Sequence, residues 1–156
     1  MVADANLLSQ VRVMADYQFG KGSGNVLFPD DVSFMLSRTK RVRQVLSGKS
    51  RIATVRAKDG VLTLSIEAAS ILHSFLPFPR QRVVICEDAV PFVSKGKTAF
   101  SKHVLELDPE LRSGEEVLVV DEQDKLLAAG QLLLAVPEIM AMDSGAAVDV
   151  RVGIEK

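Results

Sequence analysis

Two prolines, Pro77 and Pro79, interrupt the middle of the chain and limit what it can fold into. Neither a helix interior nor a central strand accepts proline, because its nitrogen carries no hydrogen to donate and its ring fixes φ. The charge balance changes sign at the same place. Residues 1–79 hold ten basic and six acidic residues, whereas residues 80–156 hold nine basic and fourteen acidic ones. We therefore predict two domains, residues 1–79 and residues 80–156.

The first half has the patterns of a mixed α+β domain. Residues 4–18 place apolar side chains at three- and four-residue spacing, which predicts a helix with Asp4 or Asn6 as its N-cap. Residues 66–76 return to helical spacing. The Asp59-Gly60 pair joins two β-rich runs, which is a strong hairpin signal. The expected strands of this antiparallel sheet are 32–36, 42–46, 52–56 and 61–64.

The second half is predicted to be mostly strand. Its only expected helix is short, Glu138–Met142, with Pro137 at a favourable opening position. Several short strands separated by turn residues are typical of a small barrel. The expected strands are 82–86, 104–107, 116–120, 126–134 and 147–152. The predicted fold class is α+β, with the antiparallel-sheet domain followed by a β-barrel-like domain.

A glycine-rich stretch, YQFGKGSG at 17–24, raises the question of a phosphate-binding loop. A Walker loop needs lysine directly followed by serine or threonine at the start of a helix, but Gly22 separates Lys21 from Ser23. A dinucleotide loop needs a preceding strand, and here the preceding segment is predicted to be helical. We interpret the stretch as a flexible connection after the helix, leading to an apolar run, 25–29, that is not helical.

The composition gives little support to metal or disulfide chemistry. The single cysteine, Cys86, lies in an apolar run and is expected to be a buried, inert thiol. Together with His73 and His103 it cannot form a cysteine-rich zinc site. We expect no metal and no cofactor. The chain has neither an apolar run of about 18 residues nor a secretory signal, so we expect a cytoplasmic protein without membrane association.

Residues 38–58 contain eight basic residues and no acidic residue. Such a run can attract a polyanion, and Arg41 and Arg43, two positions apart on a strand, share one face. We predict non-specific attraction of structured RNA, while a basic surface without a partner is the alternative. The candidate RNA-binding residues in this run are Arg38, Lys40, Arg41, Arg43, Arg51 and Arg56.

The second half resembles a PUA domain, the module named for pseudouridine synthases and archaeosine transglycosylases. The resemblance rests on an ordered series of features over most of the domain. They are Glu87-Asp88-Ala89, the stretch KGKTAF at 95–100, Lys102-His103-Val104, RSGEEV at 112–117 and LAAG at 127–130. In the first half, 15–28 and 51–73 resemble the domain that precedes the PUA domain in archaeal tRNA-guanine transglycosylase.

The resemblance covers only the accessory part of that enzyme family. The family's catalytic unit is a (β/α)₈ barrel with an aspartate nucleophile and a cysteine-rich zinc site, and such a barrel needs about 250 residues. All 156 residues here are assigned to the two accessory domains. We therefore expect a protein that is not an enzyme, and no catalytic residue is carried over.

What the resemblance implies is RNA binding, because related PUA domains hold the tRNA acceptor stem and its single-stranded 3′ end. Lysines would meet phosphates, and Gly96 would let a backbone N–H approach a phosphate oxygen. Phe100 could offer a stacking platform, but we expect it in the core. The implied RNA-binding residues are Lys95, Gly96, Lys97, Thr98, Phe100, Ser101, Lys102 and His103, with Arg151 on the last strand.

The leading hypothesis is a non-catalytic RNA-binding protein that binds tRNA and assists tRNA modification, with a separately encoded catalytic transglycosylase chain as a possible partner. One alternative is a ribosome-associated or translation factor with a PUA domain. Another is a small RNA-acting enzyme using the basic sheet. The sequence has no nucleophile–base pair to support an enzyme, and Asp59 is better explained as a turn residue.

Overall fold

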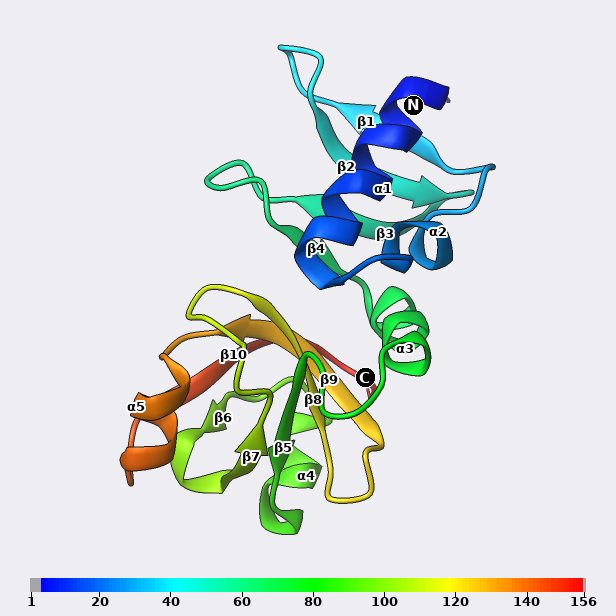
Figure 1. Cartoon of the computed structure of the whole chain (residues 1–156). Coiled ribbons are helices and arrows are strands. Elements are labelled where there is room, and N and C mark those ends of the chain that lie inside the picture. Colours follow the sequence, from blue (N-terminus) through cyan, green and yellow to red (C-terminus); the bar gives the residue numbers. More distant parts are fainter. Residues whose placement is uncertain (1–3, 156) are drawn as a thin grey trace. The chain divides into compact units, whose positions relative to one another are not determined.

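The computed structural model describes residues 4–155 and divides into two compact units, one ending at Phe75 and the other beginning at Leu76 (Figure 1). The sequence places a boundary at residue 79 instead. The segment from Leu76 lies with the second unit because the guanidinium of buried Arg82 donates to the carbonyls of Leu76 and Arg80, both at 2.9 Å. The same guanidinium forms an ion pair with Asp124.

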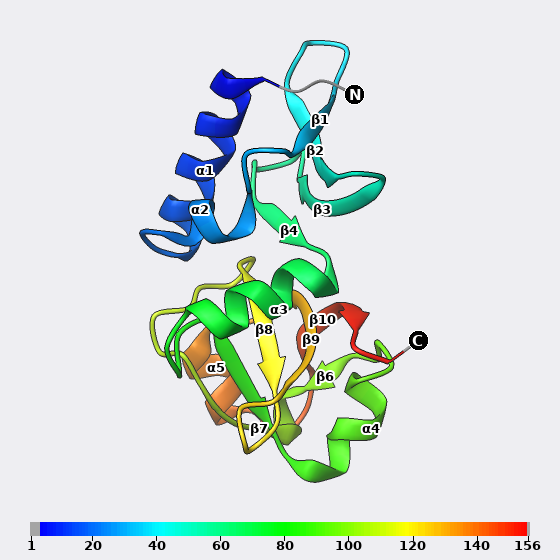
Figure 2. The same cartoon turned by 90° about the vertical axis from the view of Figure 1, so that its right-hand side faces the viewer.

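The first unit is a four-stranded antiparallel sheet with helices, as the sequence predicts. The strand order is β1-β2-β3-β4, and α1 lies across one face of the sheet (Figures 1 and 2). Asp4 is the N-cap of α1, its carboxylate accepting the N–H groups of Asn6 and Leu7. The elements are α1 (Ala5–Phe19), α2 (Ser23–Leu27), β1 (Ser33–Leu36), β2 (Val42–Ser47), β3 (Ser50–Val55), β4 (Leu62–Leu64) and α3 (Ile66–Phe75).

The core of this unit lies between α1 and the sheet. Phe34, Val45 and Ala53 are cross-strand neighbours on β1, β2 and β3, and all three are fully buried. Every fourth residue of α1 from Val11 is also fully buried, namely Val11, Ala15 and Phe19. The apolar face of the helix therefore packs against the apolar face of the sheet. This contact removes both faces from water.

The glycine-rich stretch joins α1 to a short helix, α2, so the prediction of a non-helical run after it is wrong. Gly20 ends α1 with φ of 120°. Gly24 packs directly on α1: its N–H donates to the Asp16 carboxylate at 2.7 Å, and a Cβ at Gly24 would lie 2.3 Å from the carbonyl oxygen of Arg12. Close helix packing therefore accounts for this glycine without any bound phosphate.

Strand β4 is an edge strand, and α1 covers part of its exposed backbone. The Gln18 side-chain amide donates to the carbonyl of Leu62 and accepts the N–H of the same residue, both at 2.9 Å. An unpaired strand edge is open to pairing with other chains, so this contact protects it.

The second unit is a six-stranded, nearly closed barrel-like sheet with the order β6-β10-β9-β8-β5-β7. Its pairs are antiparallel except β5 with β8, which is parallel. The sequence missed both β6 and α4, because runs of two and four residues are too short to show a pattern. The elements are β5 (Arg82–Ile85), a 3₁₀ turn (Glu87–Ala89), α4 (Val90–Val93), β6 (Ala99–Phe100), a second 3₁₀ turn (Ser101–His103), β7 (Val104–Leu107), β8 (Glu116–Val120), β9 (Leu126–Leu132), α5 (Val136–Ala141) and β10 (Ala146–Gly153).

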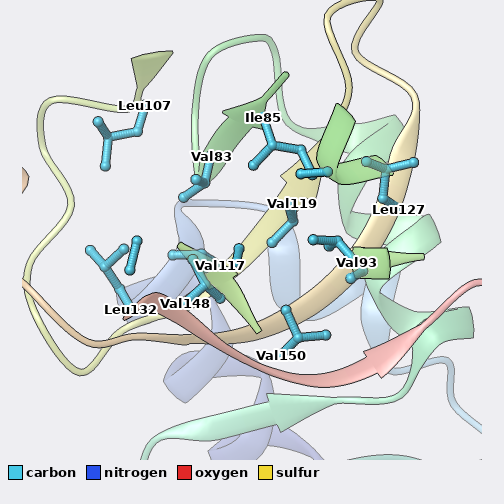
Figure 3. Close-up of a cluster of buried hydrophobic side chains, with 14 of the residues drawn as sticks. Val83, Ile85, Val93, Leu107, Val117, Val119, Leu127, Leu132, Val148 and Val150 are labelled. Carbon is cyan, nitrogen blue, oxygen red and sulfur yellow. The ribbon is translucent and has the colours of Figure 1, made fainter. Parts of the chain in front are cut away.

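The barrel encloses one apolar core. Figure 3 shows Val83 of β5, Val119 of β8, Leu127 of β9 and Val150 of β10 pointing toward one another, with Val93 of α4 closing one side. Cys86 packs against this cluster but is only partly buried, whereas the sequence predicted a buried thiol.

Candidate nucleic-acid interface

A pocket of about 320 Å³ lies beside α4 and β6 in the second unit, and it collects several of the residues that the PUA resemblance implies. Its wall is mostly apolar. Phe92 is 62% exposed and Phe100 is 43% exposed, so both rings can meet a ligand. The lining residues are Ala89, Phe92, Val93, Lys97, Thr98, Phe100 and His103.

The expectation that Phe100 lies in the core is wrong. Successive side chains of a strand point to opposite faces, and on β6 the fully buried neighbour Ala99 takes the inward position. Phe100 therefore points outward. Its ring meets the His103 ring edge-on, with a centroid distance of 6.5 Å and an interplanar angle of 72°.

A tight turn after α4 positions Lys95 and Lys97, whose side chains are exposed. Gly96 has φ of 98°, a conformation that favours glycine, and its N–H donates to the carbonyl of Val93 at 2.9 Å. The N–H of Lys97 donates to the carbonyl of Phe92 at 3.1 Å. The N–H groups of Gly96 and Lys97 are therefore engaged within the turn, and the side chains of Lys95 and Lys97 are exposed to solvent.

The end of β10 supports this turn, which the sequence did not predict. The N–H of Glu155 donates to the carbonyl of Ser94 at 2.9 Å. A Cβ at Gly153 would lie 2.2 Å from the same carbonyl oxygen and 2.8 Å from the Gly96 nitrogen. Only glycine fits at position 153 without moving the turn.

Two other candidate residues differ in exposure: Ser101 is buried, whereas Arg151 is exposed but held in an ion pair. Ser101 is 3% exposed, and its hydroxyl has no hydrogen-bond partner among the residues that the structure describes. Arg151 on β10 forms an ion pair with Glu116 of β8, including a 2.8 Å bond from Nη1 to Oε1. Glu116 is 2% exposed, so Arg151 compensates a buried charge. Lys102, in contrast, is exposed beside the pocket residue His103.

A second hollow, a groove of about 510 Å³, lies in the first unit between the β1–β2 and β3–β4 connections. Figure 1 shows both connections at the same end of the sheet. Its lining residues are Ser37, Thr39, Arg41, Val42, Arg43, Val55, Arg56, Ala57, Lys58, Asp59 and Gly60. We call it the hairpin groove.

The β1–β2 connection is ordered by its own hydrogen bonds. The Ser37 hydroxyl accepts the N–H of Arg41 at 3.2 Å, and Lys40 has φ of 67°. Met35 pairs with Gln44 but Leu36 pairs with Val42, so Arg43 is the extra residue of a β-bulge. Bulges redirect side chains and are common beside functional sites.

The β3–β4 connection contains an ion pair. Arg56 donates to both carboxylate oxygens of Asp59, at 2.9 and 2.6 Å. The Arg56 hydrogen bond is the main cause that lowers the pKa of Asp59 from 3.8 to about 2; the N–H of Val61 and the nearby charge of Lys58 act in the same direction. Asp59 also accepts that Val61 N–H at 3.1 Å, which confirms its predicted role as a turn residue.

The structure thus gathers Arg41, Arg43 and Arg56 in the groove wall. Arg38 and Lys40 are exposed in the adjacent hairpin turn. Arg51 instead donates to the Thr54 hydroxyl along β3. Across residues 4–155, no cluster of three histidine, cysteine, aspartate or glutamate side chains could hold a metal ion.

Comparisons with known proteins identify the class of protein to which this chain belongs. The PUA domain family matches residues 81–154, and the patch-forming domain C2 of tRNA-guanine transglycosylase matches residues 9–79. The chain is therefore a PUA-domain protein with a C2 domain of the tRNA-guanine transglycosylase type, as the sequence predicted.

The particular resemblance is to archaeal tRNA-guanine(15) transglycosylase. The chain is 45% identical to the enzyme of Pyrococcus furiosus over 151 residues, which is 97% of this chain and 26% of that protein. It is 44% identical to the enzyme of Methanothermobacter thermautotrophicus over 94% of this chain and 22% of that protein. The chain thus spans about a quarter of the length of these relatives.

Solved structures show the same fold at low sequence identity. A hypothetical protein from Pyrococcus horikoshii has a TM-score of 0.74 at 18% identity, with 98% of this chain and 93% of that chain covered. A PUA domain from Aeropyrum pernix has a TM-score of 0.69 at 10% identity, with 100% and 86% covered. None of the helices in the described part of the chain is long and apolar enough to cross a membrane.

Proposed function

We propose that this chain is a non-catalytic RNA-binding protein that holds the acceptor stem and single-stranded 3′ end of tRNA and assists tRNA modification. The observation that carries the proposal is the pocket of the PUA domain, which is lined by two exposed phenylalanine rings and by exposed Lys97. Unstacked bases of single-stranded RNA are held by aromatic rings, while basic side chains hold the phosphates.

Each pocket residue has a role in this proposal. Phe100 and Phe92 provide surfaces for a base, and Lys97 and His103, which also line the pocket, would bind a sugar or phosphate. Lys95 and Lys102 extend the positive charge beyond the pocket. Gly96 and Gly153 set the backbone of the turn, while Ser101 and Arg151 support the surrounding structure.

The relatives suggest what the binding serves. They are tRNA-guanine(15) transglycosylases, and the matched part comprises their C2 and PUA domains. We therefore propose that the chain delivers tRNA to a separately encoded catalytic transglycosylase chain. Joint elution of the two chains and tRNA in size-exclusion chromatography would support this partnership, and separate elution at micromolar concentrations would contradict it.

The test of the pocket is a titration of tRNA with the wild-type protein and with Phe100→Ala, followed by fluorescence anisotropy. Loss of one stacked base should cost about 1–3 kcal/mol, or roughly a 5- to 150-fold weaker affinity. Because stacking is not ionic, the weakening should be similar at low and high salt.

Phe78→Ala is the matched control, since Phe78 is another exposed phenylalanine of the same unit but does not line the pocket. Thermal unfolding of each variant checks the fold. Equal affinities of the wild-type protein and Phe100→Ala would contradict the proposed pocket.

A further inference from the structure

We propose that the hairpin groove of the first unit is a separate site for the phosphodiester backbone of helical RNA, with Arg41, Arg43 and Lys58 as its phosphate ligands. The inference rests on the proposed RNA-binding function and adds a second site to it. It also divides the basic run 38–58 into residues that bind and residues that shape the groove.

The charges of the groove are not equivalent. Arg56 is held by both carboxylate oxygens of Asp59, so this pair contributes little net charge and forms a fixed wall. Arg41, Arg43 and Lys58 form no ion pair with any residue from 4 to 155. Arg41 and Arg43 are therefore compensated mainly by solvent ions, which a polyanion releases when it binds, and Lys58 also feels the nearby charge of Asp59.

The groove is also preorganised. Ser37 and Lys40 fix the β1–β2 connection, and the bulge directs Arg43 out of the regular ladder. On the other side, Asp59 fixes the β3–β4 connection through Arg56 and Val61. Cations on an ordered frame lose less conformational entropy on binding than cations on a mobile loop.

The lining chemistry selects the kind of ligand. Among residues 4–155, no aromatic residue lines the hairpin groove, in contrast to the PUA pocket with Phe92 and Phe100. A site for unstacked bases uses aromatic platforms, whereas a helix offers rows of phosphates to basic side chains. The groove therefore fits the sugar-phosphate backbone of a stem, read without regard to sequence.

The probe for this site is a blunt-ended RNA hairpin, because it has no single-stranded 3′ end for the PUA pocket. Affinities are measured over a range of salt concentrations for the wild-type protein and for the double variant Arg41→Gln/Arg43→Gln. Each phosphate contact contributes a slope of about 0.7–0.9 in log affinity against log salt, so the variant should lose roughly 1.4–1.8 of the slope.

The matched control is Lys21→Gln/Lys49→Gln, which removes two exposed positive charges from the same unit outside the groove. Its slope should stay within about 0.3 of the wild-type slope, because a distant charge makes no phosphate contact.

The outcomes separate the two proposals. If the wild-type protein binds the hairpin but Arg41→Gln/Arg43→Gln keeps the full slope, or if both double variants lose slope equally, the groove is not a site. The proposed function would stand in that case. If the wild-type protein binds neither the hairpin nor tRNA, the proposed function itself fails.

Discussion

Asp59 places a negative charge where a phosphate is proposed to bind. Neighbouring residues reduce the repulsion that this charge would exert on the phosphate. Arg56 neutralises the carboxylate through two hydrogen bonds and lowers the pKa of Asp59 to about 2. The pair is therefore a fixed, nearly neutral element at physiological pH. The pair stabilises the hairpin, whereas Arg41, Arg43 and Lys58 are the residues proposed to attract phosphates.

This pair predicts a pH-dependent contribution to stability. A lowered pKa stabilises the folded state at pH values above the ordinary pKa of 3.8, and the effect disappears as pH falls toward 2. Asp59→Asn should lower the free energy of unfolding by about 0.2–1 kcal/mol at pH 7, which is typical of an exposed pair. Urea unfolding at pH 7, 4, 3 and 2 measures the difference. A difference that increases toward pH 2 would contradict this account.

A second prediction concerns two adjacent residues, Gly24 and Ser23. We expect the two residues to contribute differently to the stability of the first unit. Gly24→Ala would place a Cβ 2.3 Å from the carbonyl oxygen of Arg12, so α2 must move away from α1. We expect a loss of about 1–3 kcal/mol in the free energy of unfolding, as for other overpacked sites.

Ser23→Ala is the control for that substitution. The Ser23 hydroxyl is buried and has no hydrogen-bond partner in the part of the chain that the structure describes. Its removal should leave stability unchanged or slightly increased, since an unsatisfied buried polar group is costly. Guanidinium unfolding of both variants checks the pair, and an equal loss in both would argue against close packing as the reason for Gly24.

At the scale of elements, the end of β10 determines where the turn between α4 and β6 lies. Gly153→Ala should displace the turn from Ser94 to Lys97, because the new Cβ would lie 2.2 Å from the Ser94 carbonyl oxygen. We expect weaker binding of the tRNA 3′ end with an unchanged salt dependence, since no charge is removed.

Gly114→Ala serves as the comparison for this prediction. Its Cβ would have no atom of residues 4–155 within 4 Å, but its φ of 94° strains alanine, so stability should fall without a loss of RNA affinity. Anisotropy titration and thermal unfolding of both variants separate the two effects. A full-affinity Gly153→Ala protein would show that the turn position does not matter.

The elements also show what the sequence could predict. Strands β7 and β8 have their predicted bounds, because turn residues flank clear apolar runs. The outward position of Phe100 could not be predicted, since it depends on a two-residue strand that exists only through pairing with β10. The ion pair of Arg151 could not be predicted either, because Glu116 lies 35 residues away in the sequence. Sequence patterns record local periodicity, and these features depend on distant contacts.

At the scale of the whole molecule, each unit has its own core and its own candidate site. The C2-type unit has a net positive charge and contains the hairpin groove, whereas the PUA unit has a net negative charge. We propose that the units are independent domains joined near the proline segment. The buried Arg82 contacts with Leu76 imply that a PUA fragment needs its residues from position 76 onward.

A fragment of residues 76–156 tests this proposal. It should unfold in one cooperative transition and keep its preference for an intact tRNA 3′ end. It should also show a weaker salt dependence than the full chain, because the groove cations are absent. Circular dichroism melts and anisotropy titrations provide the measurements. A fragment without cooperative unfolding would contradict the independence of the domains.

If the PUA pocket holds the single-stranded 3′ end of tRNA, as proposed, affinity for this protein should differ between intact tRNA and tRNA lacking that end. Trimming should weaken binding to the wild-type protein but have much less effect on Phe100→Ala, because both changes remove the same contact. The measurement is the dissociation constant for all four combinations at one salt concentration. If intact and trimmed tRNA bind the wild-type protein equally well, the pocket is not a site for the 3′ end, and the account is contradicted.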